Sequence, residues 1–275
     1  MLYTVELTSE LLHGNRRPLA HITFADGKKG TYLTLDGFSM ESFDAGLAQL
    51  RRCLDPITSW RELTKQVTFF PSVNFFIETL SAKEPPLPIK TALLYYGIPL
   101  DSICSDYRTG HRTFKLKLRR FDETTVHALD TLVGLLPAIR LRLDFNGSIK
   151  ELPPDLKRWL AHPCLDYIEE PGFHPSDYNC PIDRFAVDES LRKHGLIPYQ
   201  DYSTFIIKPL LQVDDDRTIE RLCSCNKRVI ISSAFESQEG ITALKTIIVR
   251  HQLTHDTHGL DTLKYHGMPP ASVSA

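Results

Sequence analysis

Charged side chains recur at nearly even intervals through the middle of this 275-residue chain. Several short apolar runs end in a charged residue, and the residues that lead these ends are Lys117, Asp144, Glu169, Asp188 and Lys208. The steps between them are 27, 25, 19 and 20 residues. The runs themselves are rich in aliphatic and β-branched residues, as buried strands are. This phasing indicates that successive parallel strands deliver charged groups to one place.

Three members of the series are carboxylates, namely Asp144, Glu169 and Asp188. Three clustered negative charges repel one another strongly unless a cation lies among them. Ligation by oxygen alone suits a hard divalent ion, and a small set of protein ligands with open positions suits Mg²⁺ best. We therefore expect these three residues to be metal ligands and Mg²⁺ to be the cofactor.

Lysines flank the predicted metal site on two sides. Lys115 and Lys117 share one face of their strand, because successive side chains of a strand alternate between its faces. Lys208 ends a strand further along the chain, before Pro209.

Each signal also has a structural explanation when it is taken alone. A Lys-x-Lys pair is usually a solvated sheet edge, and Glu169-Glu170-Pro171 is typical of an exposed turn. Asp188 precedes a short helical pattern and fits a helix N-cap. The functional interpretation depends on the joint phasing of these residues over successive strands.

The elements that must position these residues predict an α/β protein with a (β/α)7β TIM-like barrel. Residues 89–270 alternate between strand and helix patterns in about seven units of about 26 residues, which is a βα repeat length. An open doubly wound sheet is the alternative, but no Gly-rich phosphate loop follows any strand. We predict strands at Ile89–Tyr96, Thr113–Leu118, Ile139–Phe145, Leu165–Ile168, Arg184–Val187, Thr204–Lys208 and Val229–Ser232. Helices are predicted at Glu123–Leu136, Asp155–His162, Arg217–Asn226 and Ile241–His251.

A small α+β capping domain is predicted ahead of the barrel. Strand patterns come first and helix patterns follow, at Leu2–Thr8, Leu19–Phe24, Thr31–Leu35, then Phe43–Leu54, Trp60–Val67 and Val73–Leu80. Ser42, Ser59 and Ser72 are the expected N-caps of the three helices. The proline-rich segment 83–88 breaks regular structure, so we place the domains at 1–88 and 89–275, with a disordered tail after residue 268.

Composition excludes several classes of protein. A net charge of −2 provides no broad positive field for nucleic acid or an anionic membrane, and no apolar run approaches the ~20 residues that span a bilayer. The six scattered cysteines indicate reduced thiols, and His251, His255 and His258 resemble a solvated helix end more than a metal site. We expect a cytoplasmic protein, a monomer or small homo-oligomer, that binds neither nucleic acid nor membrane.

The set of motifs resembles the enolase superfamily. Lys115-Leu-Lys117, Asp144-Phe-Asn146, Glu169-Glu-Pro171, Asp188-Glu-Ser190 and Lys208-Pro209 look like its barrel motifs, in order along successive strands. Within the superfamily the chain is similar to the muconate-lactonizing subgroup, and most similar to the o-succinylbenzoate synthases. Further matching segments are 37–42, 71–73, 232–237 and 258–262. The chain is short for the superfamily, so we expect the last barrel strand and its helix to be reduced.

The resemblance implies roles for single residues. It makes Asp144, Glu169 and Asp188 the Mg²⁺ ligands and Lys117 the catalytic base, with Lys115 beside it and Lys208 facing it across the substrate. Ser232 and Ser233 correspond to positions that bind the substrate side chain. The loop with Phe38 and Ser39 corresponds to the part of the cap that closes over the pocket.

The resemblance also implies a small-molecule carboxylate substrate and a reaction. That reaction is the syn dehydration of 2-succinyl-6-hydroxy-2,4-cyclohexadiene-1-carboxylate to 2-succinylbenzoate in menaquinone biosynthesis, through an enediolate. N-acylamino-acid racemisation or dipeptide epimerisation on the same scaffold is the alternative. A barrel that only binds, without catalysis, is a second alternative, and it predicts the loss of a ligand or a lysine.

Overall fold

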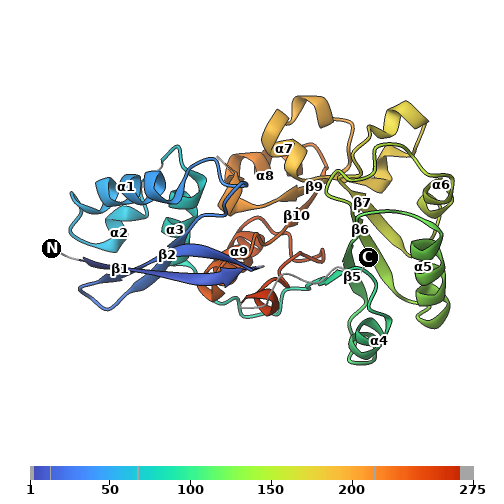
Figure 1. Ribbon diagram of the computed structural model, residues 1–275. Coiled ribbons are helices and arrows are strands. Elements are labelled where there is room, and N and C mark those ends of the chain that lie inside the picture. Colours follow the sequence, from blue (N-terminus) through green and yellow to red (C-terminus); the bar gives the residue numbers. More distant parts are fainter. Residues whose placement is uncertain (1–2, 13, 67, 213–214, 267–275) are drawn as a thin grey trace.

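The computed structural model describes residues 3–12, 14–66, 68–212 and 215–266, which form two sheets with their helices (Figure 1). The amino-terminal part builds a small antiparallel sheet with three helices. The rest builds a curled parallel sheet with helices around it. The predicted tail after residue 268 lies outside the described residues.

The small sheet has the order β1-β2-β3, with strands Tyr3–Leu12, Asn15–Phe24 and Lys29–Leu33. Helices α1 (Phe43–Leu54), α2 (Trp60–Leu63) and α3 (Pro71–Ser81) complete this part, which we call the cap. Its core is a separate cluster of buried side chains that includes Ile22, Tyr32, Leu50 and Phe76. Ser42 caps α1 as predicted, because its hydroxyl accepts a hydrogen bond from the amide of Ala45 (3.2 Å).

Two predicted helices in the cap differ from the structure, one at its end and one at its start. The helix predicted at Trp60–Val67 ends at Leu63, and Val67 lies outside the described residues. Ser72 is inside α3, which begins at Pro71, where a proline fits the first helical turn. The buried Ser72 hydroxyl bonds Glu41 instead of capping a helix.

The parallel sheet has seven strands among the described residues, in the order β10-β9-β8-β7-β6-β5-β4. The strands are β4 (Leu93–Tyr96), β5 (Thr113–Lys117), β6 (Arg140–Asp144), β7 (Leu165–Glu169), β8 (Phe185–Val187), β9 (Thr204–Ile207) and β10 (Arg228–Ile231). The helices are α4 (Leu100–Arg108), α5 (Glu123–Leu135), α6 (Pro154–Leu160), α7 (Glu189–His194), α8 (Asp215–Ser224) and α9 (Gln238–Arg250). Short 3₁₀ helices lie at Pro175–Tyr178, Ile182–Arg184, Ile197–Tyr199, Pro209–Leu211 and Leu263–Tyr265.

A reduced eighth strand closes the sheet into a barrel. His258 bridges Thr91, just before β4, and Gly259 bridges Ser232, just after β10, both in parallel. The amide of His258 donates to the carbonyl of Lys90 (2.8 Å), and the amide of Gly259 donates to Ile231 (2.9 Å). The predicted (β/α)7β barrel with a small cap is therefore confirmed, with a short final strand.

His258 corrects the interpretation of the histidine cluster as a solvated helix end. The imidazole is fully buried, its Nδ1 lies 3.0 Å from the amide of Ile231, and its Nε2 lies 3.0 Å from the carbonyl of Leu253. Nδ1 therefore accepts and Nε2 donates, which is the neutral form. Burial lowers the pKa of His258 to about 4.

A network of charged side chains fills the barrel toward the amino-terminal ends of the strands. Arg142 donates to Asp166 (2.8 Å), and Arg228 joins Asp166 (2.8 Å) to Asp256 (2.7 Å). Both guanidinium groups lie near the ring of Tyr167, at 4.9 and 5.6 Å from its centroid. We call Arg142, Asp166, Tyr167, Arg228 and Asp256 the basal network.

Two other expectations concern the whole chain. All six cysteines are free, as predicted. Within the part of the chain that the structure describes, no helix has the length and apolar character needed to cross a bilayer.

Candidate active site

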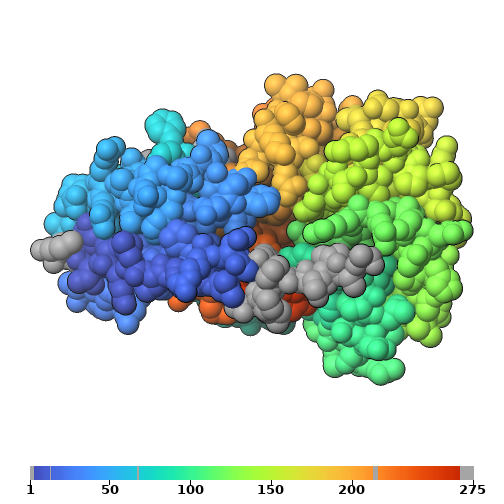
Figure 2. All heavy atoms as spheres, viewed as in Figure 1, coloured from blue at the N-terminus to red at the C-terminus, as the bar shows by residue number. Residues whose placement is uncertain are grey.

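A cavity of about 230 Å³ lies at the carboxyl ends of the barrel strands, where the cap meets the barrel. Figure 2 shows the cap in blue beside the orange part of the barrel, with the green part on the far side. The lining is largely apolar, and its three lysines come from β5 and from the end of β9. It consists of Leu35, Phe38, Ala92, Leu94, Tyr96, Lys115, Lys117, Asn146, Glu189, Lys208, Leu211, Ser232, Ser233, Ala234, Phe235, Gly259, Asp261 and Thr262.

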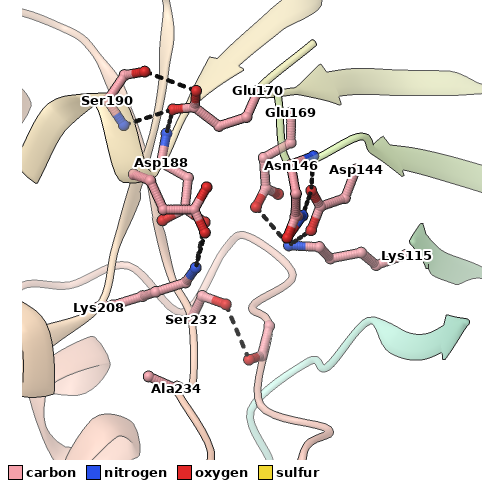
Figure 3. A network of polar contacts seen from close by, with 12 residues as sticks. Lys115, Asp144, Asn146, Glu169, Glu170, Asp188, Ser190, Lys208, Ser232 and Ala234 are labelled. Carbon is pink, nitrogen blue, oxygen red and sulfur yellow. Dashed lines mark hydrogen bonds and ion pairs between the residues drawn. The ribbon is translucent and has the colours of Figure 1, made fainter. Parts of the chain in front are cut away.

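Strand register brings the predicted residues to one level. Lys117 is the register partner of Asp144 across β5 and β6, and Asp144 is the partner of Glu169 across β6 and β7. Asp188 and Lys208 directly follow β8 and β9. Because parallel strands place their carboxyl ends at one edge, these side chains meet at the barrel mouth. Figure 3 shows Asp144, Glu169, Asp188 and Lys208 there.

Lys115 joins two of the three carboxylates. Its ammonium donates to Glu169 (2.6 Å) and lies 2.9 Å from an oxygen of Asp144. The residue is only 8% exposed, so the solvated-edge interpretation of the Lys-x-Lys pair is wrong for Lys115.

The third carboxylate, Asp188, pairs with Lys208 (Figure 3). The ammonium of Lys208 also lies 3.8 Å from Glu189. Asp188 occupies the N-cap position of α7, but its side chain makes no capping hydrogen bond. Glu170 supplies that function, because its carboxylate accepts from the amides of Asp188 (2.8 Å) and Ser190 (2.9 Å).

Burial and neighbouring charges shift the pKa values of the residues at the barrel mouth in opposite directions. Burial alone would raise the pKa of Asp144, but Lys115 and Lys117 outweigh it and hold that pKa well below its usual range. The pKa of Glu169 rises to about 8, because burial together with Asp144 and Asp188 outweighs Lys115. Burial opposes the charge of Lys115, yet Asp144 and Glu169 raise the pKa of that ammonium well above its usual value.

Lys117 is the most exposed of the three lysines that line the cavity. Its side chain is 25% exposed, against 10% for Lys115 and 14% for Lys208. The ammonium donates weakly to the amide oxygen of Asn146 (3.4 Å) and lies 3.8 Å from Asp144. This loose environment leaves Lys117 free to contact a molecule in the cavity.

The donor set of the mouth fits a divalent cation. One oxygen of Glu169, Oε2, is buried and has no hydrogen-bond partner, which is costly for a carboxylate. Asp144 and Asp188 form ion pairs with Lys115 and Lys208. With the side chains in these positions, no group of three or more His, Cys, Asp or Glu among the described residues is arranged to bind a metal ion. Three buried carboxylates with one orphaned oxygen nevertheless have the chemistry that Mg²⁺ prefers.

The residues predicted to bind the substrate divide into two groups. Phe38, Ser232 and Ser233 line the cavity, whereas Ser39 lies outside the lining. The hydroxyl of Ser39 accepts from the amide of Leu35 (2.9 Å) and ties the turn that presents Phe38. The hydroxyl of Ser233 is already engaged by Glu236 and Thr262.

Some residues of the site were not predicted. Tyr96 ends β4 and lines the cavity, with its ring centroid 6.0 Å from the Lys117 ammonium. The rule that strand ends carry the site would have identified Tyr96. Phe235 and Asp261 belong to loops, and no spacing in the sequence marks them as part of the lining.

Comparison with known proteins gives structural matches only. No family model and no curated protein matches the sequence. An o-succinylbenzoate synthase from Thermosynechococcus elongatus BP-1, solved with Mg in its active site, is 21% identical, with a TM-score of 0.72 over 98% of this chain and 95% of that chain. MenC from Desulfotalea psychrophila LSv54 is 19% identical, with a TM-score of 0.70 over 94% of this chain and 93% of that one.

A third match has a different activity in its name. A dipeptide epimerase from Methylococcus capsulatus, solved with an Mg ion, is 18% identical, with a TM-score of 0.66 over 90% of this chain and 87% of that chain. These matches extend over both the cap and the barrel. The chain therefore shares the fold of these solved o-succinylbenzoate synthase and dipeptide epimerase structures.

Proposed function

We propose that this protein is an Mg²⁺-dependent enzyme of the enolase superfamily that acts as an o-succinylbenzoate synthase. Its substrate would be 2-succinyl-6-hydroxy-2,4-cyclohexadiene-1-carboxylate, which loses water to give 2-succinylbenzoate. The observation that carries the proposal is the placement of Lys117 in the cavity, 3.8 Å from one acid of a buried three-carboxylate cluster.

Asp144, Glu169 and Asp188 are the proposed ligands of Mg²⁺, and the orphaned oxygen of Glu169 supports this assignment. Bound there, the cation supplies a positive charge that stabilises the substrate carboxylate as its α-proton leaves. Lys115 and Lys208 now balance the charge of the three acids, so both have to shift their contacts when a cation binds.

Lys117 performs the proton transfers. As a neutral amine it takes the proton from the carbon next to the substrate carboxylate, and the electron pair of that C–H bond stays on the substrate. The resulting ammonium then gives the proton to the departing hydroxyl on the same side of the ring. The C–O bond breaks, water leaves, and the ring becomes aromatic.

The rest of the cavity suits a carbocyclic substrate. Leu35, Leu94 and Tyr96 provide apolar and aromatic surface for the ring. Lys208 enters the same cavity from β9 and can stabilise the negatively charged ring by an electrostatic or cation–π contact.

The partners of the cavity acids favour the dehydration over dipeptide epimerisation. A dipeptide carries an ammonium group that needs an acid in the cavity, and the lining has two, Asp261 and Glu189. The amide of Leu94 (2.9 Å) and the ammonium of Lys264 (2.5 Å) already engage Asp261, and the ammonium of Lys208 lies 3.8 Å from Glu189.

The test is to incubate the purified protein and Mg²⁺ with the cyclohexadiene substrate and to follow the ultraviolet absorbance of the diene. The proposal predicts loss of the diene and formation of 2-succinylbenzoate. If the protein instead exchanges the α-proton of N-succinylamino acids or dipeptides with solvent deuterium, and leaves the diene intact, the racemase or epimerase alternative is correct. A protein that does neither and binds no Mg²⁺ at millimolar concentration is a binding module.

A further inference from the structure

One contact joins the cap to the loop that follows β10, over a separation of 218 residues along the chain. Arg17 of β2 donates a hydrogen bond from Nη2 to the carbonyl of Phe235 (2.8 Å). Phe235 lines the cavity together with its neighbours Ser232, Ser233 and Ala234. The cap therefore contacts the cavity wall through a residue that is itself outside the lining.

Arg17 is held rigidly from the cap side. It is 4% exposed, and it is the cross-strand partner of Glu10 in the β1–β2 pair. Both Nε (2.9 Å) and Nη2 of Arg17 donate to the same oxygen of Glu10. Burial opposes ionisation of Glu10, but hydrogen bonds from His266 and Arg17 lower the pKa of that carboxylate to about 2, so the pair stays charged.

The loop that Arg17 contacts is strained. Phe235 has a φ of 65°, in the left-handed region that a bulky residue rarely occupies. Such a conformation is strained and persists only where surrounding contacts enforce it. The amide of Phe235 donates to the Ser233 hydroxyl (3.2 Å), and the carbonyl of Phe235 accepts from Arg17, so both sides of the residue are fixed.

A buried carboxylate next to Phe235 also fixes this loop. Glu236 is fully buried, and its Oε2 accepts from the Ser233 hydroxyl (2.5 Å) and from the amide of Ala234 (2.7 Å). Its other oxygen, and Nη1 of Arg17, are buried without hydrogen-bond partners. A Cβ at Gly240 of α9 would collide with the Glu236 side chain and would lie in tight contact with Phe75 of the cap. Glu236 therefore packs closely against α9, next to the cap.

We propose that Arg17 is a positioning residue that shapes the substrate side-chain pocket by holding Phe235 in its left-handed conformation. Arg17, Phe235 and Glu236 form the cap–loop clamp. This inference rests on the proposed function for the identity of the substrate, and it assigns the wall at 232–235 to recognition of the succinyl side chain. Arg17 does not touch the reacting atoms, so its loss acts on substrate binding.

The experiment compares Arg17→Met with Arg16→Met, a change of the exposed neighbour on the same strand. Two readouts are used: steady-state kinetics with the diene substrate, and hydrogen–deuterium exchange of the peptide that covers residues 232–237. We expect R17M to raise KM at least tenfold with kcat changed less than threefold, and to raise amide exchange in this peptide at least tenfold. R16M should change neither readout by more than twofold.

A kcat loss without a KM change, or unchanged exchange at 232–237 in folded R17M, would overturn the assignment. If R17M does not fold, Glu10→Gln carries the test, because a neutral amide holds Arg17 less strongly than the carboxylate does and the contact to Phe235 is left in place. E10Q should then raise KM and loop exchange about threefold, and no change in either refutes the clamp. Hydrogen–deuterium exchange needs no turnover. If the wild-type protein has no synthase activity, the proposed function is refuted, and the exchange of the 232–237 peptide still tests the clamp.

Discussion

The two ends of the barrel both contain buried charged groups, but they use them differently. In the basal network, two arginines and two aspartates are matched, and each guanidinium also lies near the ring of Tyr167. At the mouth, three lysines face three carboxylates with a mixture of short and long contacts, and one oxygen of Glu169 has no partner.

The difference separates charges that stabilise a fold from charges that are available for chemistry. Arginine stays ionised and its planar fork binds carboxylates in a fixed geometry, which suits the closed end. Lysine changes protonation more readily, and the pKa of Glu169 is raised to about 8 in its buried environment. Perturbed acids with lysine partners in a cavity are typical of a catalytic site.

The largest expected effect is on turnover at the mouth. Lys117→Ala removes the proposed base and should lower kcat by about 10³-fold or more with the fold intact, since general-base catalysis contributes about 10²–10⁴-fold. The diene assay gives kcat, and circular dichroism checks the fold. Lys227→Ala, at the amino-terminal side of β10, is the control and should keep the wild-type kcat. A K117A protein with most of the wild-type rate would remove the assignment.

At the closed end the same type of change should act on stability. Arg142→Met leaves the buried Asp166 with one cation fewer and the carbonyl of Thr257 without its donor, at a cost of about 3–5 kcal/mol of unfolding free energy. Urea titration measures this cost. Arg158→Met breaks only exposed pairs, with Asp130 and Asp155, and should cost less than about 1 kcal/mol. Equal costs for both variants would show that the basal network is not structural.

His258, which closes the barrel, should make the fold sensitive to acid. Its pKa is about 4 when folded and 6.5 when free, so the folded state binds fewer protons and stability falls as the pH drops from 6.5 toward 4. A shift of this size corresponds to about 3 kcal/mol.

The measurement is urea unfolding at pH 7 and pH 4. The wild type should lose about 3 kcal/mol more over this range than His258→Asn does. His127→Asn, a change of an exposed histidine on α5, should lose as much as the wild type. Parallel pH profiles for the wild type and H258N would show that His258 does not titrate as described.

A smaller effect is expected from the metal on stability. Mg²⁺ at about 100 times its Kd should stabilise the wild type by about 2.7 kcal/mol, because it binds only the folded state. Glu169→Gln should abolish this gain, whereas Glu239→Gln, on the exposed side of α9, should retain it. Thermal unfolding with and without Mg²⁺ shows the difference, and a Tm gain in E169Q equal to that of the wild type would exclude Glu169 as a ligand.

Much of the fold could be predicted because strand ends and helix repeats are local patterns. The charged ends at Lys117, Asp144 and Glu169 mark β5, β6 and β7, and the structure places these residues in register. The short closing strand could not be located this way, since two bridging residues have no periodicity. Helix α4 was also missed, and Ile103 is its one buried residue, so its pattern is faint.

The parts of the site that sequence reasoning missed depend on contacts between distant segments. Nothing near Arg17 indicates that it reaches Phe235, because that contact forms only when the cap docks on the barrel. The pairing of Lys115 with two acids is likewise a property of three strands together. Sequence patterns can name the residues of the mouth, but their protonation and contacts require the assembled barrel.

The most direct measurement is a crystal structure of the protein grown with Mn²⁺, using anomalous scattering to locate the ion. The account predicts one peak bounded by oxygens of Asp144, Glu169 and Asp188, with Lys115 and Lys208 turned away from those oxygens and Lys117 still facing the cavity. Carboxylates that keep their lysine partners, with the ion absent or bound elsewhere, would contradict it.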